Sequence, residues 1–111
     1  MPTWRIHLPD PTTARGSDPD LAFRSTGAEG FAGELQAALA GDGLFRRWRA
    51  KQFEPDEVDP ALGAVDPQAT VTGTQREKRA ELVVRTSLSS DVLRHRLRLL
   101  AGPHWELRDV H

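Results

Sequence analysis

A chain of 111 residues, 38% of them hydrophobic, has the size of one domain, large enough to bury about two thirds of the surface that its unfolded form exposes. The formal net charge of -1 argues against wholesale binding to phosphate backbones, because nucleic-acid-binding domains normally carry a clear positive excess. The absence of cysteine excludes disulfides, thiolate nucleophiles and zinc sites that use sulfur.

The polar character of the chain indicates a soluble protein. Charged residues make up 28% of the sequence, and the mean hydropathy is -0.52. The amino terminus lacks the apolar stretch of a secretory signal, and no run approaches the length of about 20 apolar residues that a membrane span needs. We therefore expect a folded protein in the cytoplasm, with no membrane partner.

The first part of the chain is predicted as strand, loop, strand and helix. Alternating apolar residues predict strands over residues 4–8 and 21–25. Two Asp-Pro pairs place a loop over residues 9–20, because proline fixes φ and aspartate bonds its own backbone. A helix is predicted over residues 27–40, with Thr26 and Glu29 at the spacing of a capping box.

The segment LFRRWRAKQF, residues 44–53, allows two interpretations. We predict a strand over residues 44–52, since a possible internal repeat places this segment on the last strand of the chain. The alternative is a helix that begins at Asp42 and stacks Leu44, Phe45 and Trp48 on one face. Arginine and lysine favour this alternative, because they form helices better than strands.

The second part of the chain begins with an acidic loop over residues 54–69, which contains two further Asp-Pro pairs. Strands are predicted over residues 70–74, 82–87 and 105–110, where β-branched and aromatic residues gather. The amphipathic pattern between the last two strands predicts a helix from Ser90, its expected N-cap, to Ala101, where glycine and proline stop it.

A shift of the sequence by 61 residues aligns LAFRST with LVVRTS and one LAG with another. Two strand–helix–strand halves, residues 21–53 and 70–111, would then follow an N-terminal strand and loop at residues 1–20. Such halves make an α+β, ferredoxin-like fold. We expect one domain over residues 1–111, in which two helices cover one face of an antiparallel sheet and an N-terminal strand or hairpin is added.

In this fold one face of the sheet is cationic and carries aromatic rings. Six of its eight side chains are positively charged, and the predicted binding residues are Arg24, Phe45, Arg47, Arg49, Lys51, Phe53, Arg85 and Arg108. A solvated sheet face has the same composition, with charges that prevent edge aggregation. The other interpretations are a contact with a protein or a second copy, and a platform on which bases of a single strand stack.

No grouping of residues predicts catalysis. The chain has no GxSxG elbow and no close spacing of histidine and carboxylate that suggests a metal site. We therefore expect no metal and no cofactor, although an absent motif leaves an enzyme open. The function that we predict is a small, non-catalytic interaction or regulatory module that self-associates or binds another protein. The alternative is binding of single-stranded RNA or DNA through the basic sheet face.

Overall fold

The computed structural model describes residues 2–110 and has an α+β fold with an open, four-stranded antiparallel sheet and three helices. Residues 1 and 111, the outer limits of the predicted domain, lie outside this range. The elements in chain order are β1 (Thr3–Leu8), α1 (Ala28–Ala40), α2 (Gly43–Ala50), β2 (Thr70–Arg76), β3 (Arg79–Arg85), α3 (Ser90–Ala101) and β4 (Glu106–Val110). Two short 3-10 turns, η1 (Pro55–Glu57) and η2 (Pro60–Gly63), lie in the acidic loop between α2 and β2.

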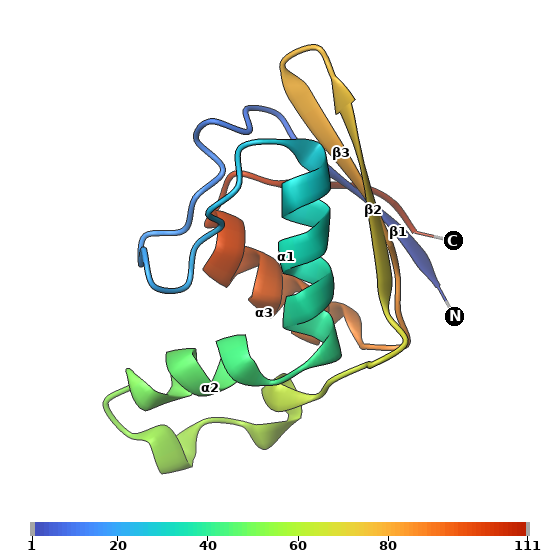
Figure 1. The fold of residues 1–111 in the computed structure, drawn as a ribbon. Coiled ribbons are helices and arrows are strands. Elements are labelled where there is room, and N and C mark those ends of the chain that lie inside the picture. Colours follow the sequence, from blue (N-terminus) through green and yellow to red (C-terminus); the bar gives the residue numbers. More distant parts are fainter. Residues whose placement is uncertain (1, 111) are drawn as a thin grey trace.

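The strand order across the sheet is β2-β3-β1-β4, and every neighbouring pair is antiparallel. The two longer helices, α1 and α3, cover one face of the sheet, and α2 crosses the end of this helical layer (Figure 1). Because side chains alternate along a strand, each strand sends every second residue toward the helices. In β1 these residues are Trp4, Ile6 and Leu8, all of them buried.

The core lies between the sheet and the helices. Ile6 of β1 is paired with Leu82 of β3, and both are fully buried. The helices contribute apolar stripes at spacings of three and four, which is the pattern that faces a core. The largest fully buried side chains of these stripes are Phe31, Leu35 and Leu39 from α1 and Leu93 and Leu97 from α3.

The edge strand β2 is held against α1 by unusually close contacts. A Cβ atom added to Gly73 would clash with the carbonyl oxygen of Ala28, so the strand and the start of the helix meet backbone to backbone. Two glutamine side chains complete the contact. Gln36 Oε1 accepts a hydrogen bond of 2.9 Å from the Val71 N–H, and Gln75 Oε1 accepts one of 3.3 Å from the Ala28 N–H.

Most predicted elements are confirmed. The strands at residues 4–8, 70–74, 82–87 and 105–110 correspond to β1, β2, β3 and β4, and the helices at residues 27–40 and 90–101 correspond to α1 and α3. Their caps differ from the prediction. The capping box does not form, because Gly27 is the N-cap of α1 and no side chain caps it. At α3 the cap is Ser89 instead of Ser90, and its Oγ accepts from the Val92 N–H.

Two predicted strands are wrong. Residues 44–50 belong to α2, and residues 51 and 52 follow its C-terminal end. The helix buries Leu44 and Phe45 on its inner side, as the alternative interpretation required. Residues 21–25 begin in a turn at Leu21 and Ala22, continue as irregular chain and pair with no strand. The strand–helix–strand pattern predicted for residues 21–53 is therefore wrong. The N-terminal strand, expected as an addition, is β1 at the centre of the sheet.

Within residues 2–110, none of the helices has both the length and the apolar character needed to cross a lipid bilayer.

Candidate anion-binding groove

The eight predicted binding residues do not share a sheet face. Arg24 lies in the loop before α1, whereas Phe45, Arg47 and Arg49 lie on α2 and Lys51 and Phe53 follow it. Arg85 and Arg108 belong to the strands β3 and β4. Phe45 is buried, so its ring cannot serve as a contact surface, whereas the Phe53 ring is 96% exposed. The premise that placed these residues together, an extended chain from Leu44 onward, is wrong.

The sheet face that is turned away from the helices has a different set of charges. Alternation places Arg5, Arg76 and Arg85 there, and Glu81 lies among them. The Glu81 carboxylate forms ion pairs with Arg5 at 3.1 Å and Arg76 at 3.4 Å. The strands place neither Phe nor Trp on this face within residues 2–110, so it lacks rings on which bases could stack. This surface resembles a solvated, partly neutralised sheet face.

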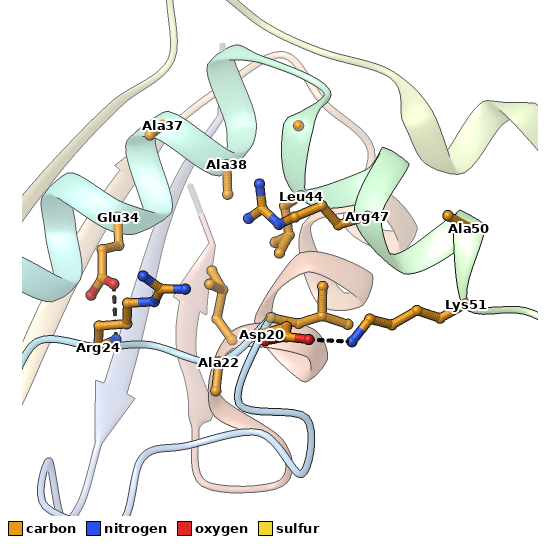
Figure 2. Close-up of a pocket in the computed structure, with 13 residues that line it drawn as sticks. Asp20, Ala22, Arg24, Glu34, Ala37, Ala38, Leu44, Arg47, Ala50 and Lys51 are labelled. Atoms are coloured by element: carbon orange, nitrogen blue, oxygen red, sulfur yellow. Dashed lines mark hydrogen bonds and ion pairs between the residues drawn. The ribbon is translucent and has the colours of Figure 1, made fainter.

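A groove of about 780 Å³ lies elsewhere, between the segment 20–24, α1 and α2. Its floor is apolar and its rim is charged (Figure 2). The apolar lining comes from Leu21, Ala22, Ala38, Leu44 and Leu100. The groove therefore brings together three of the predicted residues, Arg24, Arg47 and Lys51, although it does so from a loop and a helix end instead of a sheet.

Side chains, not a neighbouring strand, hold the segment that carries Arg24. The carboxylate of Glu34 accepts hydrogen bonds from the Arg24 N–H at 2.9 Å and the Ser25 N–H at 3.1 Å. The guanidinium of Arg15 donates to the carbonyl oxygens of Phe23 at 2.8 Å and Ser25 at 2.7 Å. Because these side chains bond the N–H groups of residues 24 and 25 and the carbonyl groups of residues 23 and 25, the backbone around Arg24 is held in place on the rim.

One face of α2 forms the opposite wall. Residues three and four apart share a helical face, and Gly43, Arg47 and Ala50 line the groove at this spacing. The neighbouring Arg46 is exposed but does not line it. The side chain of Arg49 is directed toward the acidic loop instead of the groove, and its Nε donates to the Pro55 carbonyl at 3.0 Å.

Lys51 is neutralised by the protein itself. Its Nζ lies 2.9 Å from Asp18 Oδ2 and 2.8 Å from Asp20 Oδ2. The hydrogen bond to Asp18, with that to Asp20, raises the pKa of Lys51, and the same contact lowers the pKa of Asp18. Lys51 and Asp18 thus remain charged and paired near neutral pH, and Lys51 has less charge to offer a ligand.

Arg24 and Arg47 differ from Lys51 in having no such partner. Their guanidinium groups extend toward each other from opposite walls of the groove (Figure 2). Between residues 2 and 110, neither side chain finds a hydrogen-bond acceptor or an ion-pair partner. Two like charges that converge in this way repel each other, and an anion between them would remove the repulsion and accept several hydrogen bonds. The geometry is therefore suited to a carboxylate or a similar planar anion.

The residues present do not form a metal site, since no three or more His, Asp or Glu side chains in the described chain gather closely enough to hold an ion. Comparison of the chain with protein-family models, with curated proteins and with solved structures found no match.

Sequence reasoning missed the acidic half of this site. Asp20 and Glu34 were not among the predicted residues, although Asp20 pairs with Lys51 and Glu34 positions Arg24. The helical interpretation of residues 44–53 could have indicated the cationic half of the site, because a helix from Asp42 places Arg47 and Lys51 four residues apart on one face. Nothing in the sequence indicated which loop would lie opposite that face.

Proposed function

We propose that this protein is a non-catalytic interaction module of ferredoxin-like topology that resides in the cytoplasm. The strand order supports the topology. β1 and β2 both run antiparallel to β3, so they are parallel to each other with one strand between them, and α1 connects them. β3, α3 and β4 repeat this arrangement around β1. Two such units make the split βαβ pattern.

The partner that we propose is an acidic protein segment, bound in the groove. The single observation that carries this proposal is the convergence of Arg24 and Arg47, two guanidinium groups without acceptors above an apolar floor. Guanidinium binds carboxylate through two parallel hydrogen bonds, and the floor can take an aliphatic or aromatic side chain beside the acid. The groove holds no grouping of nucleophile, base and orienting residue that would indicate catalysis.

A titration with a tri-glutamate peptide at low ionic strength tests the proposal. We expect the backbone amide resonances of the 15N-labelled protein to shift around Arg24 and Arg47, and the shifts to shrink as salt is added. Arg24→Gln and Arg47→Gln should each weaken the binding by about tenfold, the equivalent of about 1.4 kcal/mol. Arg46→Gln is the matched control, because this exposed arginine is on the same helix but outside the groove. Unchanged groove resonances at saturating peptide would refute the proposal.

Single-stranded RNA or DNA is the competing ligand. The cations of the groove favour it, whereas the absence of ring side chains from the groove lining opposes it. The same experiment with an oligothymidylate distinguishes the two ligands. Larger shifts with the oligonucleotide than with the peptide, together with a steep dependence on salt, would replace the acidic segment by a nucleic acid.

A further inference from the structure

The chain that follows α2 has the chemistry that the groove lacks. Residues 53–57, FEPDE, which we call the acidic tip, combine an aromatic ring with three carboxylates. Phe53 is 96% exposed, the most exposed of the large hydrophobic residues in the described chain. Glu54, Asp56 and Glu57 are also exposed, and Arg49 Nη2 lies 3.6 Å from Asp56 Oδ1.

The acidic tip and the groove are complementary in both charge and polarity. The tip offers carboxylates where the groove offers the free guanidinium groups of Arg24 and Arg47. It also offers the ring of Phe53, which gains free energy when it leaves water, and the groove has an apolar floor to receive it. Each surface therefore exposes groups that complement those of the other.

We propose that the acidic tip of one copy docks in the groove of a second copy. This inference rests on the proposed function, since it names the acidic segment that the groove binds. In the complex the guanidinium groups of Arg24 and Arg47 donate to carboxylates of the tip, and the Phe53 ring lies on the apolar floor.

The position of the two surfaces favours a closed dimer. The groove uses one face of α2, and the acidic tip continues from the C-terminal end of the same helix (Figure 1). Two copies related by a two-fold axis near α2 can thus exchange tip and groove reciprocally, with the same contact formed twice. The formal net charge of -1 gives two copies little reason to repel each other. Because the contact is small and charged, we expect a weak dimer that salt dissociates.

Sedimentation velocity tests this inference at concentrations from about 10 µM to about 1 mM, a range that reports dissociation constants of weak complexes. The wild-type protein should pass from monomer to dimer within it. Phe53→Ser should remain monomeric with an unchanged circular dichroism spectrum, because the ring contributes almost no burial to the fold. The double variant Arg24→Glu, Arg47→Glu should also remain monomeric, whereas Arg46→Glu, a charge reversal outside the groove, should dimerise like the wild type.

A mixing experiment tests whether tip and groove meet each other. Neither the Phe53→Ser variant nor the double arginine variant should associate alone, but the first keeps an intact groove and the second an intact tip. Their mixture should therefore form a 1:1 complex that is held by one of the two contacts and is weaker than the wild-type dimer. A wild-type protein that is monomeric at every concentration overturns the inference, and so does a dimer that both variants preserve. In either case the tri-glutamate titration still decides separately whether the groove binds acidic segments.

Discussion

Trp48 on α2 and His95 on α3 meet edge to face, with their ring centroids 4.3 Å apart. Neither nitrogen of the His95 ring has a hydrogen-bond partner among the residues described, and both are buried. Burial lowers the pKa of His95, and the charges of Arg96 and Arg98 lower it further. Helix α2 forms one wall of the groove. One of the contacts that hold it against the rest of the helical layer is thus made with a neutral imidazole.

Acidification should therefore destabilise the protein through His95. The unfolded chain takes up this proton near the ordinary pKa of 6.5, whereas the folded chain takes it up only at lower pH. Between these two values the unfolded state binds more protons, so the free energy of unfolding falls as the pH falls below about 6.5. Urea titrations at several pH values measure this slope. His95→Gln should flatten it, and an equal slope in wild type and variant would show that another group is responsible.

Two glycine-to-alanine substitutions should have opposite effects. At Gly73 the added methyl group would clash with the Ala28 carbonyl, so the variant must separate β2 from α1 and should lose about 1–3 kcal/mol of stability. At Gly33, inside α1, nothing lies within 4 Å of the added atom. Alanine there should stabilise the helix by about 0.5–1 kcal/mol. Thermal unfolding of both variants provides the comparison, and a stable Gly73→Ala protein would contradict the close packing of β2.

Arg96 presents a buried charge that the fold satisfies incompletely. The residue is 0% exposed, and Nη2 donates to the Ala64 carbonyl at 2.9 Å, but Nε and Nη1 have no partner within residues 2–110. Burial also lowers the pKa of Arg96. Replacing such a group by an apolar one of similar volume is often neutral or stabilising. We expect Arg96→Met to melt at or above the wild-type temperature, whereas Arg96→Ala, which leaves a cavity, should melt lower.

Asp66 anchors the start of β2 to the end of β3, and its contacts should govern unfolding in acid. Its Oδ2 accepts from the Ser87 N–H at 3.0 Å and from the fully buried Thr86 Oγ1 at 2.9 Å. These hydrogen bonds lower the pKa of Asp66 below its ordinary value of 3.8, and the bond from the Ser87 N–H has the largest effect. The stabilisation is thus present above about pH 3.8 and is lost as the pH falls through the folded-state pKa.

Thr86→Val keeps the side-chain shape and removes one donor to Asp66, so the folded-state pKa should rise and acid unfolding should begin at a higher pH. Fluorescence-detected acid titrations measure this midpoint. Thr72→Val, an exposed position on β2, is the control and should leave the midpoint in place. If both variants unfold at the wild-type pH, the Asp66 network does not control acid stability.

The parts of the fold that local patterns determine could be predicted from the sequence. The helix at residues 90–101 combines a stripe of leucines with a glycine stop, and both signals agree with its tertiary role. The segment after Leu44 carried conflicting signals. Its aromatic and apolar residues fit a strand, its arginines fit a helix, and the burial of Leu44 and Phe45 against the core decided for the helix.

The segment at residues 21–25 shows a different limit. Its alternation correctly indicated that Leu21 and Phe23 are buried. A strand, however, also needs a partner strand, and here Arg15 and Glu34 take over the backbone bonds that such a partner would make. Side-chain replacements of this kind depend on contacts between distant positions, so no local pattern reveals them. The groove was hidden for the same reason, because its two walls come from separate parts of the chain.

The hydrogen bond from the Val71 N–H to Gln36 bears on how readily other chains can add to the edge of the sheet. β2 is an outer strand, and an uncovered outer strand can template the addition of further chains and the growth of fibrils. With the Gln36 amide in place, an incoming chain must first displace a helix side chain before it can extend the sheet. Gln36 thus occupies one of the backbone donors that an added strand would need.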